Sequence, residues 1–220
     1  MKRSNLFPII FLIFCVHTMP SLAQNAVSIR VGINFGKWMT LTDGLEKYDY
    51  YDTYHAFPLI SVPTEFDLSK KWTIQVEPSL LRKGAKINYI ENKQSNRCIF
   101  KVTYIELPLL LKFRYAKFNM LLGPSIGYAT GGRIKESTLI YSSNKFPIDK
   151  KVNFDEEKYP RKDVSLNGGL GLNFDRSGFD VRYTLSLTNL GIKGDGNAKY
   201  YNQGIQLAYT YCLGINRKVE

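Results

Sequence analysis

Apolar and polar residues alternate along much of the chain with a period of two. From Val27 to Phe35 the odd positions are apolar, whereas the even positions are Ser, Arg, Gly and Asn. This alternation is typical of a β-strand with two unlike faces. The pattern recurs further along the chain, so the sequence predicts eight strands: 27–36, 60–66, 72–80, 104–113, 118–128, 164–174, 179–187 and 204–213.

The connections between these strands alternate between short and long. Three are short, at 67–71, 114–117 and 175–178, whereas the intervening links are longer and polar. Short periplasmic turns opposite long external loops are typical of outer-membrane barrels, whose strands cross the bilayer in about 9 to 11 residues. The sequence therefore predicts an all-β fold, an eight-stranded antiparallel up-and-down transmembrane β-barrel with both chain ends on the short-turn side.

Aromatic residues flank every predicted short turn on the apolar face of the strands. The pairs are Phe66 and Trp72, Phe113 and Phe118, and Phe174 and Phe179. Aromatic girdles mark the headgroup level of a bilayer, and a soluble barrel has no comparable reason to place rings on its outside. This pattern predicts a membrane interface at the short-turn end.

Alternation alone also fits a soluble lipocalin-like ligand-binding barrel, whose apolar face points inward. The sequence Gly36-Lys37-Trp38 matches a short lipocalin signature, although Trp38 ends the first predicted strand and does not begin it. The polar face carries charges among Gly, Ser, Asn and Thr: Arg30, Glu65, Glu77, Glu106, Lys112, Asp180 and Arg182. A basic side chain facing lipid would cost about 2 to 4 kcal/mol at the bilayer midplane. We therefore expect the polar face inside.

The N-terminal segment has the organisation of a secretory signal peptide. Lys2 and Arg3 precede an apolar run, and residues 21–23 supply a small-residue cleavage site. The run is about half of the roughly 20 residues that a membrane-spanning helix needs. Cys15 follows Phe14, where a lipidation site requires a small residue, so we expect no lipid anchor. The predicted organisation is a signal peptide over 1–23 and a barrel domain over 24–220.

Charge and cysteine content narrow the expected partners. The formal net charge of +11 favours an anionic partner. For an exported protein we expect outer-membrane lipid and lipopolysaccharide as partners, and no nucleic acid. After the predicted signal peptide the cysteines are Cys98 and Cys212, which give neither a disulfide framework nor metal-ligand spacing. We predict no metal and no cofactor.

Three segments resemble the PorT-like family of outer-membrane β-barrel proteins: YIELPLLLKF (104–113), GPSIGY (123–128) and DVRYTLSLTNL (180–190). The resemblance spans essentially the whole chain after the predicted signal and rests on strand patterns. It implies an eight-stranded barrel in the outer membrane. The namesake of the family is an accessory of a protein secretion system, and the family supplies no agreed functional residues. The chain departs from many outer-membrane proteins at its end, where residues 214–220 follow the last strand aromatic, Tyr211.

Charged residues of the polar face are candidates for a network inside the barrel. We expect Arg30 and Arg182 to pair with Glu77 and Glu106 across the lumen, because unpaired charges in water-poor surroundings are costly. A structural plug explains such a network, and a proton or ion path is the alternative. Eight strands enclose an interior about wide enough for side chains alone, which argues against a diffusion pore.

Two predicted external loops are candidates for binding. The link after the third predicted strand is basic, and we expect it to bind lipopolysaccharide phosphates, with a solvated loop as the alternative. Its basic residues are Arg82, Lys83, Lys86, Lys93 and Arg97. The loop 131–161 is long and mixed in charge, and loops of this length are usually functional or disordered. An envelope protein docking there would make the chain a secretion accessory.

His55 is the candidate for catalysis, as the one histidine after the predicted signal peptide. Some eight-stranded outer-membrane barrels modify lipids through Ser, His and acidic residues near the external rim, so a lipid-modifying enzyme is the alternative function. A lone His beside the tyrosine-rich stretch 48–54 is more often a rim residue than a general base. The sequence therefore predicts a non-enzymatic outer-membrane barrel that acts through external loops or as an accessory of an envelope or secretion complex.

Overall fold

The chain forms one antiparallel β-sheet that closes on itself. The computed structural model describes residues 24–41, 50–91, 94–139, 148–154, 159–191 and 199–215, so the predicted signal peptide lies outside the described residues. No helix in these ranges is long and apolar enough to cross a membrane. The strands are β1 (Gln24–Leu41), β2 (Tyr50–Thr53), β3 (His55–Ser61), β4 (Thr64–Asp67), β5 (Trp72–Val76), β6 (Ser79–Glu91), β7 (Gln94–Tyr115), β8 (Phe118–Leu139), β9 (Ile148–Lys151), β10 (Lys162–Asn173), β11 (Ser177–Ser186) and β12 (Lys199–Ile215).

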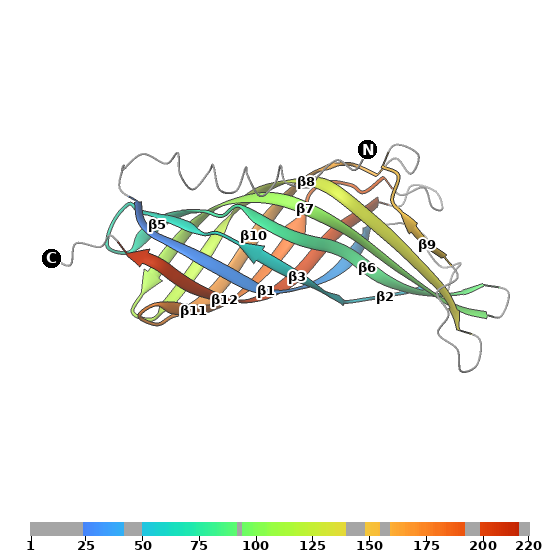
Figure 1. The fold of residues 1–220 in the computed structure, drawn as a ribbon, viewed down its shortest axis with the longest axis horizontal. Helices are drawn as coiled ribbons and strands as arrows, with labels where there is room; N and C mark the ends of the chain where they lie inside the picture. Colours follow the sequence, from blue (N-terminus) through green and yellow to red (C-terminus); the bar gives the residue numbers. More distant parts are fainter. Residues whose placement is uncertain are drawn as a thin grey trace, which may run out of the picture.

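The sheet closes because β1 pairs on one side with β3 and β4 and on the other with β12. The order around the ring is β1, β3–β4, β5–β6, β7, β8, β10, β11 and β12, so eight strands form a barrel (Figure 1). β2 pairs with β6 and β9 pairs with β8 beyond the closed ring. The predicted eight-stranded antiparallel barrel is confirmed.

Two barrel strands are divided at proline residues. Pro63 separates β3 from β4, and Pro78 separates β5 from β6. Proline has no backbone N–H to donate to the ladder. Its carbonyl still accepts, and Val62 N donates to Pro78 O at 2.9 Å. Each divided strand therefore crosses the barrel as one unit, with continuous pairing on both sides of the proline.

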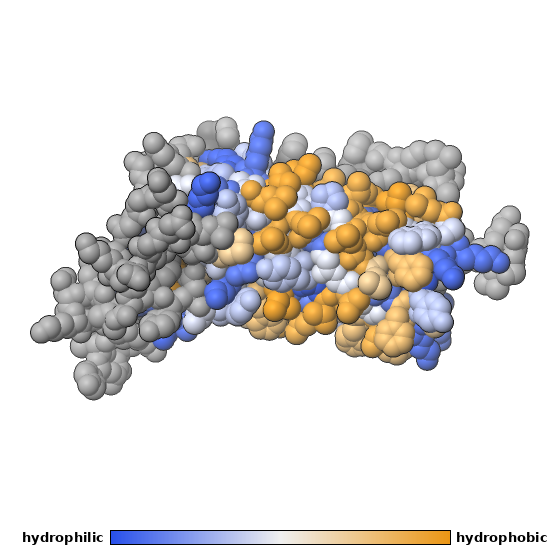
Figure 2. Space-filling model, turned by 180° about the vertical axis from the view of Figure 1, so that it is seen from behind, coloured by the Kyte–Doolittle hydropathy of each residue, from blue (hydrophilic) through white to orange (hydrophobic). Residues whose placement is uncertain are grey.

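Side chains alternate between the lumen and the outer surface as expected. Along β7, Leu107 and Leu109 are each 51% exposed, whereas Leu110 is fully buried and Glu106 is 2% exposed. The exposed apolar side chains form a band around the middle of the barrel (Figure 2). The lipocalin-like alternative required apolar residues inside and polar residues outside, and it is wrong.

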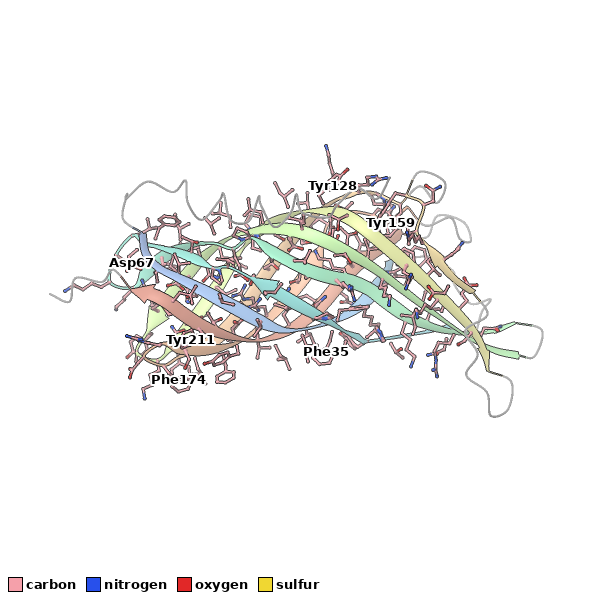
Figure 3. All side chains as sticks on the ribbon, in the orientation of Figure 1. Phe35, Asp67, Tyr128, Tyr159, Phe174 and Tyr211 are labelled. Carbon is pink, nitrogen blue, oxygen red and sulfur yellow. The ribbon has the colours of Figure 1, made fainter. Side chains whose placement is uncertain are left out.

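Aromatic rings surround the short-turn end of this apolar band. The ring centroids of Trp72 and Phe113 lie 4.9 Å apart, and those of Phe174 and Phe179 lie 6.4 Å apart. Figure 3 places Tyr211 at the same end as Phe174. Aromatic side chains are favoured at the headgroup level of a bilayer, where the apolar part of the ring contacts lipid and any polar group contacts water.

Lipids with brominated acyl chains should quench the fluorescence of Trp72 strongly and leave that of Trp38 nearly unchanged. Trp72 is 44% exposed on the outer surface, whereas Trp38 is 4% exposed. These are the two tryptophans of the chain, so the variants Trp38→Phe and Trp72→Phe isolate each signal. Equal quenching of the two single-tryptophan proteins in vesicles would contradict the apolar-outward orientation.

β6, β7 and β8 continue well past the apolar band at the end opposite the short turns (Figure 1). The β6–β7 pairing runs from Ser79↔Glu106 to Glu91↔Gln94, and the β7–β8 pairing reaches Ser95↔Leu139. The sequence analysis assigned the link after the third predicted strand and the segment 131–161 to loops. Both assignments are wrong in part, because most of the link and the residues 131–139 and 148–151 lie in strands. We call this part of the sheet the extension.

The polarity of the two faces reverses in the extension, while the even positions of β7 face inward throughout. Val102 and Phe100 face inward and are buried, whereas Lys101 between them faces outward. Below that level, the inward residue of β7 is Glu106 and the outward one is Leu107. The reversal follows from the surroundings, because water replaces lipid around the extension and apolar side chains then gain by turning inward.

Candidate functional site

Four charged side chains meet inside the barrel in what we call the arginine cluster: Arg30, Glu77, Asp180 and Arg182. Arg30 donates to both carboxylate oxygens of Asp180, at 2.9 and 2.6 Å, and its Nη1 lies 3.2 Å from Glu77 Oε1. Arg182 Nη1 donates to Glu77 Oε2 at 2.6 Å. Two cations therefore face two carboxylates, and bidentate pairing makes such contacts strong and specific in direction.

Polar neighbours complete the arginine cluster. Ser61 Oγ and Gln75 Nε2 donate to the Glu77 carboxylate at 2.7 and 2.6 Å, and Gln206 Oε1 accepts from Arg30 at 3.2 Å. Glu77 and Arg30 are each 1% exposed. A buried ion pair is stable only when further hydrogen bonds satisfy its remaining groups, and those to Glu77 and Arg30 meet that condition. Arg182 Nε has no hydrogen bond among the described residues and lies 2.8 Å from Asp180 Oδ1 as an ion pair.

A second group, the lysine cluster, consists of Lys83, Glu106 and Asp163. Lys83 Nζ lies 2.6 Å from Glu106 Oε2 and 2.8 Å from Asp163 Oδ2. Ser125 Oγ donates to Glu106 Oε1 at 2.6 Å, and Lys83 also sits over the ring of Tyr104. One cation thus bridges two carboxylates that come from β7 and β10, two strands that are separated by β8.

The predicted lumen network is therefore divided between two clusters. Arg30, Glu77 and Arg182 come together as expected, but Glu106 pairs with Lys83 and contacts neither arginine. Asp163 escaped the sequence analysis because it lies one residue before the predicted strand 164–174. Its place in the alternation, two residues before the inward-facing Ser165, is the signal that would have found it.

A third charged group lines the short-turn end of the lumen. Lys112 Nζ donates to Glu65 Oε1 at 2.6 Å, and Arg114 pairs with Asp67 and lies 3.8 Å from Glu65. These side chains are 11 to 25% exposed, more than those of the two deeper clusters. Water therefore reaches this end of the lumen.

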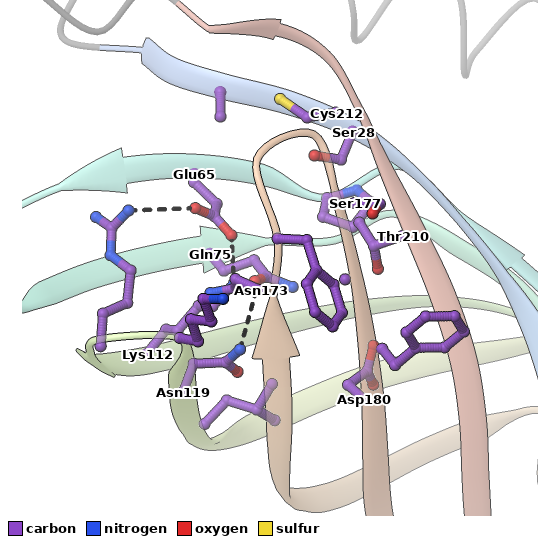
Figure 4. Close-up of a pocket in the computed structure, with 18 of the residues that line it drawn as sticks. Ser28, Glu65, Gln75, Lys112, Asn119, Asn173, Ser177, Asp180, Thr210 and Cys212 are labelled. Atoms are coloured by element: carbon purple, nitrogen blue, oxygen red, sulfur yellow. Dashed lines mark hydrogen bonds and ion pairs between the residues drawn. The ribbon is translucent and has the colours of Figure 1, made fainter.

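A cavity of about 600 Å³ opens at the same end (Figure 4). Its walls include Glu65, Lys112 and Asn119, and its inner end reaches Asp180 and Arg182 of the arginine cluster. Its polar groups largely contact one another, as in the Lys112 to Glu65 ion pair drawn in Figure 4. The members of the lysine cluster are not among its walls. The cavity is thus a vestibule that ends at the arginine cluster.

Aromatic residues fill the opposite end of the lumen and form what we call the aromatic plug: Trp38, Phe100, Phe154, Tyr159 and Tyr200. The Trp38 ring centroid lies 5.2 Å from that of Phe100 and 5.9 Å from that of Tyr200. Phe154 and Tyr159 come from the segment between β9 and β10, which the sequence analysis treated as part of an external loop. Both are buried, at 6% and 3% exposure, so these two side chains face inward and cover the lumen.

Polar contacts anchor the aromatic plug to the barrel wall, and in one of them Asn202 Nδ2 of β12 donates to the Tyr159 hydroxyl oxygen at 3.5 Å. The hydroxyl groups of Tyr159 and Tyr104 lie 3.1 Å apart. Burial raises the pKa of the Tyr159 phenol to about 12, so it stays neutral at physiological pH and keeps its proton for hydrogen bonding. Together, the aromatic plug and the two charged clusters occupy the lumen from the external end to the vestibule.

The basic residues predicted in an external loop are separated by the structure. Lys83 points into the lumen at 4% exposure, so its assignment to an external phosphate site is wrong. Arg82 and Lys86 lie on the outward face of β6, and Arg97 is half-buried on β7. Lys93 lies outside the described residues. Alternation along a strand, which the loop assignment ignored, is what separates Lys83 from its neighbours.

His55 begins β3 at the rim of the barrel. Its ring packs edge to face on Phe57, with centroids 4.8 Å apart. Burial and the nearby charges of Lys86 and Lys101 keep the pKa of His55 below its usual value, so the ring is neutral at pH 7. A general base also needs a nucleophile within hydrogen-bond reach. In the described part of the chain, the packing on Phe57 is the side-chain contact that holds this ring.

The described residues contain no group of three or more His, Cys, Asp or Glu side chains that could hold a metal ion. Within the described residues, Cys98 and Cys212 are not joined in a disulfide, and both are half-buried. Cys212 contacts the backbone carbonyls of Val27 and Gly214 near the end of β12. Both cysteines are therefore packed within strands of the sheet.

A family model described as "Outer membrane protein beta-barrel domain" matches residues 22–191. No curated protein matches the sequence. Among solved structures, the chain is similar to Neisserial surface protein A, with a TM-score of 0.45 and 9% identity over 84% of this chain and 96% of that one. It is also similar to Ail, the attachment invasion locus protein of Yersinia pestis, with a TM-score of 0.41 and 16% identity over 86% and 99% of the two chains. For the outer membrane enzyme PagL, the TM-score is 0.32 and the identity 10%, over 82% and 98% of the two chains.

Proposed function

Because the chain belongs to the outer membrane protein beta-barrel domain family, we propose that it is a non-enzymatic outer-membrane protein that works through its extension. Within the family we assign it to the PorT-like type, on the resemblance of 104–113, 123–128 and 180–190. Its role is then that of an accessory to an envelope or secretion complex. The predicted signal peptide over 1–23 would deliver it to the outer membrane.

The occupied lumen is the observation that carries this proposal. Arg30, Glu77 and Asp163 are each 1% exposed, and Lys83 is 4% exposed, so side chains fill the interior at these levels. The aromatic plug covers them from the external side. A barrel filled in this way does not offer a passage, which leaves the surface outside the membrane as the part available to a partner.

The extension supplies that surface. β7 and β8 are 22 residues each, about twice the length that a tilted strand needs to cross a bilayer. Pairing holds the two strands together along their length, up to Ser95↔Leu139. A paired sheet is a more rigid platform for a protein partner than an irregular loop, because its backbone hydrogen bonds are satisfied internally.

A tip-trimmed variant tests the proposal. Residues 88–97 and 136–148 are each replaced by Asn-Gly, which closes the hairpins next to the pairs Ile87↔Cys98 and Lys135↔Asp149. In cells lacking the native gene, we expect this variant to insert but to fail in restoring the envelope or secretion phenotype that the full chain restores. Heat-modifiable gel migration and membrane fractionation show that the variant is folded. Full complementation by a folded, tip-trimmed protein would overturn the role of the extension.

The variant His55→Ala should leave the lipid A acyl chains of the cell unchanged. The ring of His55 packs on Phe57 and sits beside two lysines, which is a structural position for a rim residue. Mass spectrometry of lipid A from cells with the full chain, the variant and no protein gives the measurement. A change in acyl chains that needs the protein and vanishes with His55→Ala would establish the lipid-modifying alternative.

A further inference from the structure

Six basic side chains occupy the outward face of the extension and form what we call the basic row: Arg82, Lys86, Lys101, Arg133, Lys135 and Lys151. They come from four neighbouring strands, β6, β7, β8 and β9. Arg133 and Lys151 are exposed, and Lys101 and Lys135 are partly exposed. The sequence analysis singled out two of them, because the rest become neighbours only through strand pairing.

Strand pairing places the centre of the row directly across the sheet. Gly84 lies opposite Lys101, Lys101 opposite Arg133, and Arg133 opposite Lys151. Side chains at directly opposed positions have Cβ atoms about 4.5 to 5.5 Å apart, and like charges there are destabilising. The three aligned cations therefore destabilise the sheet by mutual repulsion.

In the described part of the chain, one carboxylate is shared by two cations of the row. Asp149 lies 3.1 Å from Arg133 and 3.3 Å from Lys135, and it serves both cations. Burial, together with the charges of Lys135, Arg82 and Arg133, lowers the pKa of Lys101. Three cations thus repel the Lys101 ammonium group while Asp149 attracts it, and an excess of cations among neighbouring side chains favours an anion at this place.

The apolar band begins directly below the basic row on the same strands. Lys101 precedes the outward-facing Ile105 of β7 by four residues, which is about 13 Å along the strand. Leu107 and its partner Ile126 on β8 are 51% and 67% exposed. Tyr128 stands between them and the row at 49% exposure. A cationic surface and a lipid-facing surface therefore adjoin on one side of the barrel.

We propose that the basic row binds the phosphate groups of lipid A, with the acyl chains of that lipid lying on the apolar face of β7 and β8 below. Arg133 suits the bidentate recognition of phosphate, and the lysines add compact positive charge. The proposal rests on the outer-membrane placement and deepens the proposed function, since it gives the extension a fixed position against the surrounding lipopolysaccharide. It replaces the predicted loop site, in which Lys83 was included.

A charge-reversal variant of the central row is the test: Lys101→Glu, Arg133→Glu and Lys151→Glu in the full chain. The matched control reverses three exposed lysines of the short turns, Lys70→Glu, Lys71→Glu and Lys117→Glu, with the same change in net charge. Fluorescently labelled lipid A is titrated into each protein in non-ionic detergent and followed by polarisation. We expect the row variant to bind at least about tenfold more weakly than the native chain, and the control to bind like the native chain.

Three further probes identify the group that is bound. Lipid A stripped of its phosphates should bind the native chain about as weakly as intact lipid A binds the row variant. Inorganic phosphate should compete, and rising salt should weaken native binding, because exposed charges are screened. These measurements on the native chain test the recognition of lipid A phosphates even if the row variant does not fold. Equal affinity for phosphate-free lipid A, or equally tight binding of phosphatidylglycerol, would overturn the assignment to lipid A phosphates.

The outcome is separable from that of the proposed function. The tip-trimmed variant keeps Lys101, Arg133 and Lys151, so it should bind lipid A like the native chain even while it fails to complement. Loss of lipid A binding in the row variant, with complementation retained, would support the basic row and leave the partner role to the hairpin tips. Native-like lipid A binding by a folded row variant would overturn the basic row alone.

Discussion

Replacing Glu77 with Ala should lower the free energy of unfolding of the barrel by about 3 to 5 kcal/mol. Glu77 receives hydrogen bonds from Arg30 and Arg182 at 3.2 and 2.6 Å and is 1% exposed. Its removal leaves two buried guanidinium groups with a single carboxylate, Asp180, between them. Urea titration of the protein in detergent micelles, followed by the loss of heat-modifiable gel mobility, gives the free energy of unfolding.

Two variants control this expectation. Glu65→Ala also removes a paired carboxylate, but the Glu65 side chain is 12% exposed and borders the vestibule, so water can solvate the cations left behind. We expect a clearly smaller loss there. Glu77→Gln keeps the shape and one acceptor oxygen while removing the charge, which separates charge from packing. If Glu77→Ala and Glu65→Ala lower the free energy of unfolding equally, the burial of Glu77 is not the reason for the destabilisation.

The membrane-spanning part of the fold was predictable from sequence because one rule holds throughout it. Where lipid lies outside, apolar side chains face outward, and the alternation of Leu107, Leu109 and Leu111 with Glu106 and Leu110 expresses that rule. Its two faces differ so strongly that the strand and the face of each residue follow together. Each predicted strand therefore coincides with an observed strand or divided strand, apart from the breaks at Pro63 and Pro78 and one residue at the ends of 164–174 and 179–187.

The extension was missed because the same rule reverses there. Above the band, Phe100 and Val102 turn inward and Lys101 turns outward, since water now lies outside. A sequence analysis that expects the same face to be apolar along the whole strand assigns a loop where the apolar face changes, although the strand continues. The register shift between Thr103 and Tyr104 in the β7–β8 pairing falls at the same level. Two opposite alternations on one strand are the signal that marks a barrel strand leaving the bilayer.

Partner choice inside the lumen could be predicted only in part. Alternation gives the face on which a charge lies, and it placed Arg30, Glu77 and Arg182 correctly inside. It does not give the height at which a residue sits relative to residues on other strands, which strand tilt and register determine. Lys83 lies opposite Val102 of β7, four residues from Glu106, so their contact depends on strand tilt and on the length of the lysine side chain, which strand ranges alone do not contain.

The aromatic plug could not be predicted, because the segment that closes it has no periodic pattern. Phe154 and Tyr159 lie in a polar stretch between β9 and β10, and only the chain path brings them against Trp38 and Phe100. Sequence patterning identifies strands by repetition, and a short inward-turning link has none. Phe154 and Tyr159 of this link nonetheless help to close the external end of the lumen.

Replacing Trp38 with Ala should cost about 3 to 5 kcal/mol of unfolding free energy, the usual range for a buried large aromatic residue. Trp38 is 4% exposed and contacts the rings of Phe100 and Tyr200, so its loss opens a cavity in the middle of the aromatic plug. The matched control is Trp72→Ala, which removes the same side chain from the outer surface and one ring contact with Phe113, worth about 0.5 to 1.5 kcal/mol.

Ion conductance separates the stability of the aromatic plug from closure of the lumen. In planar bilayers, Trp38→Ala should remain non-conducting, because the arginine and lysine clusters still fill the lumen below the plug. A variant that combines Trp38→Ala with Glu77→Ala and Glu106→Ala removes one member from each of the three layers of closure and should conduct if it inserts. Conductance of Trp38→Ala alone would mean that the plug is the true seal and that the charged clusters admit ions, which would restore the ion-path alternative for the lumen.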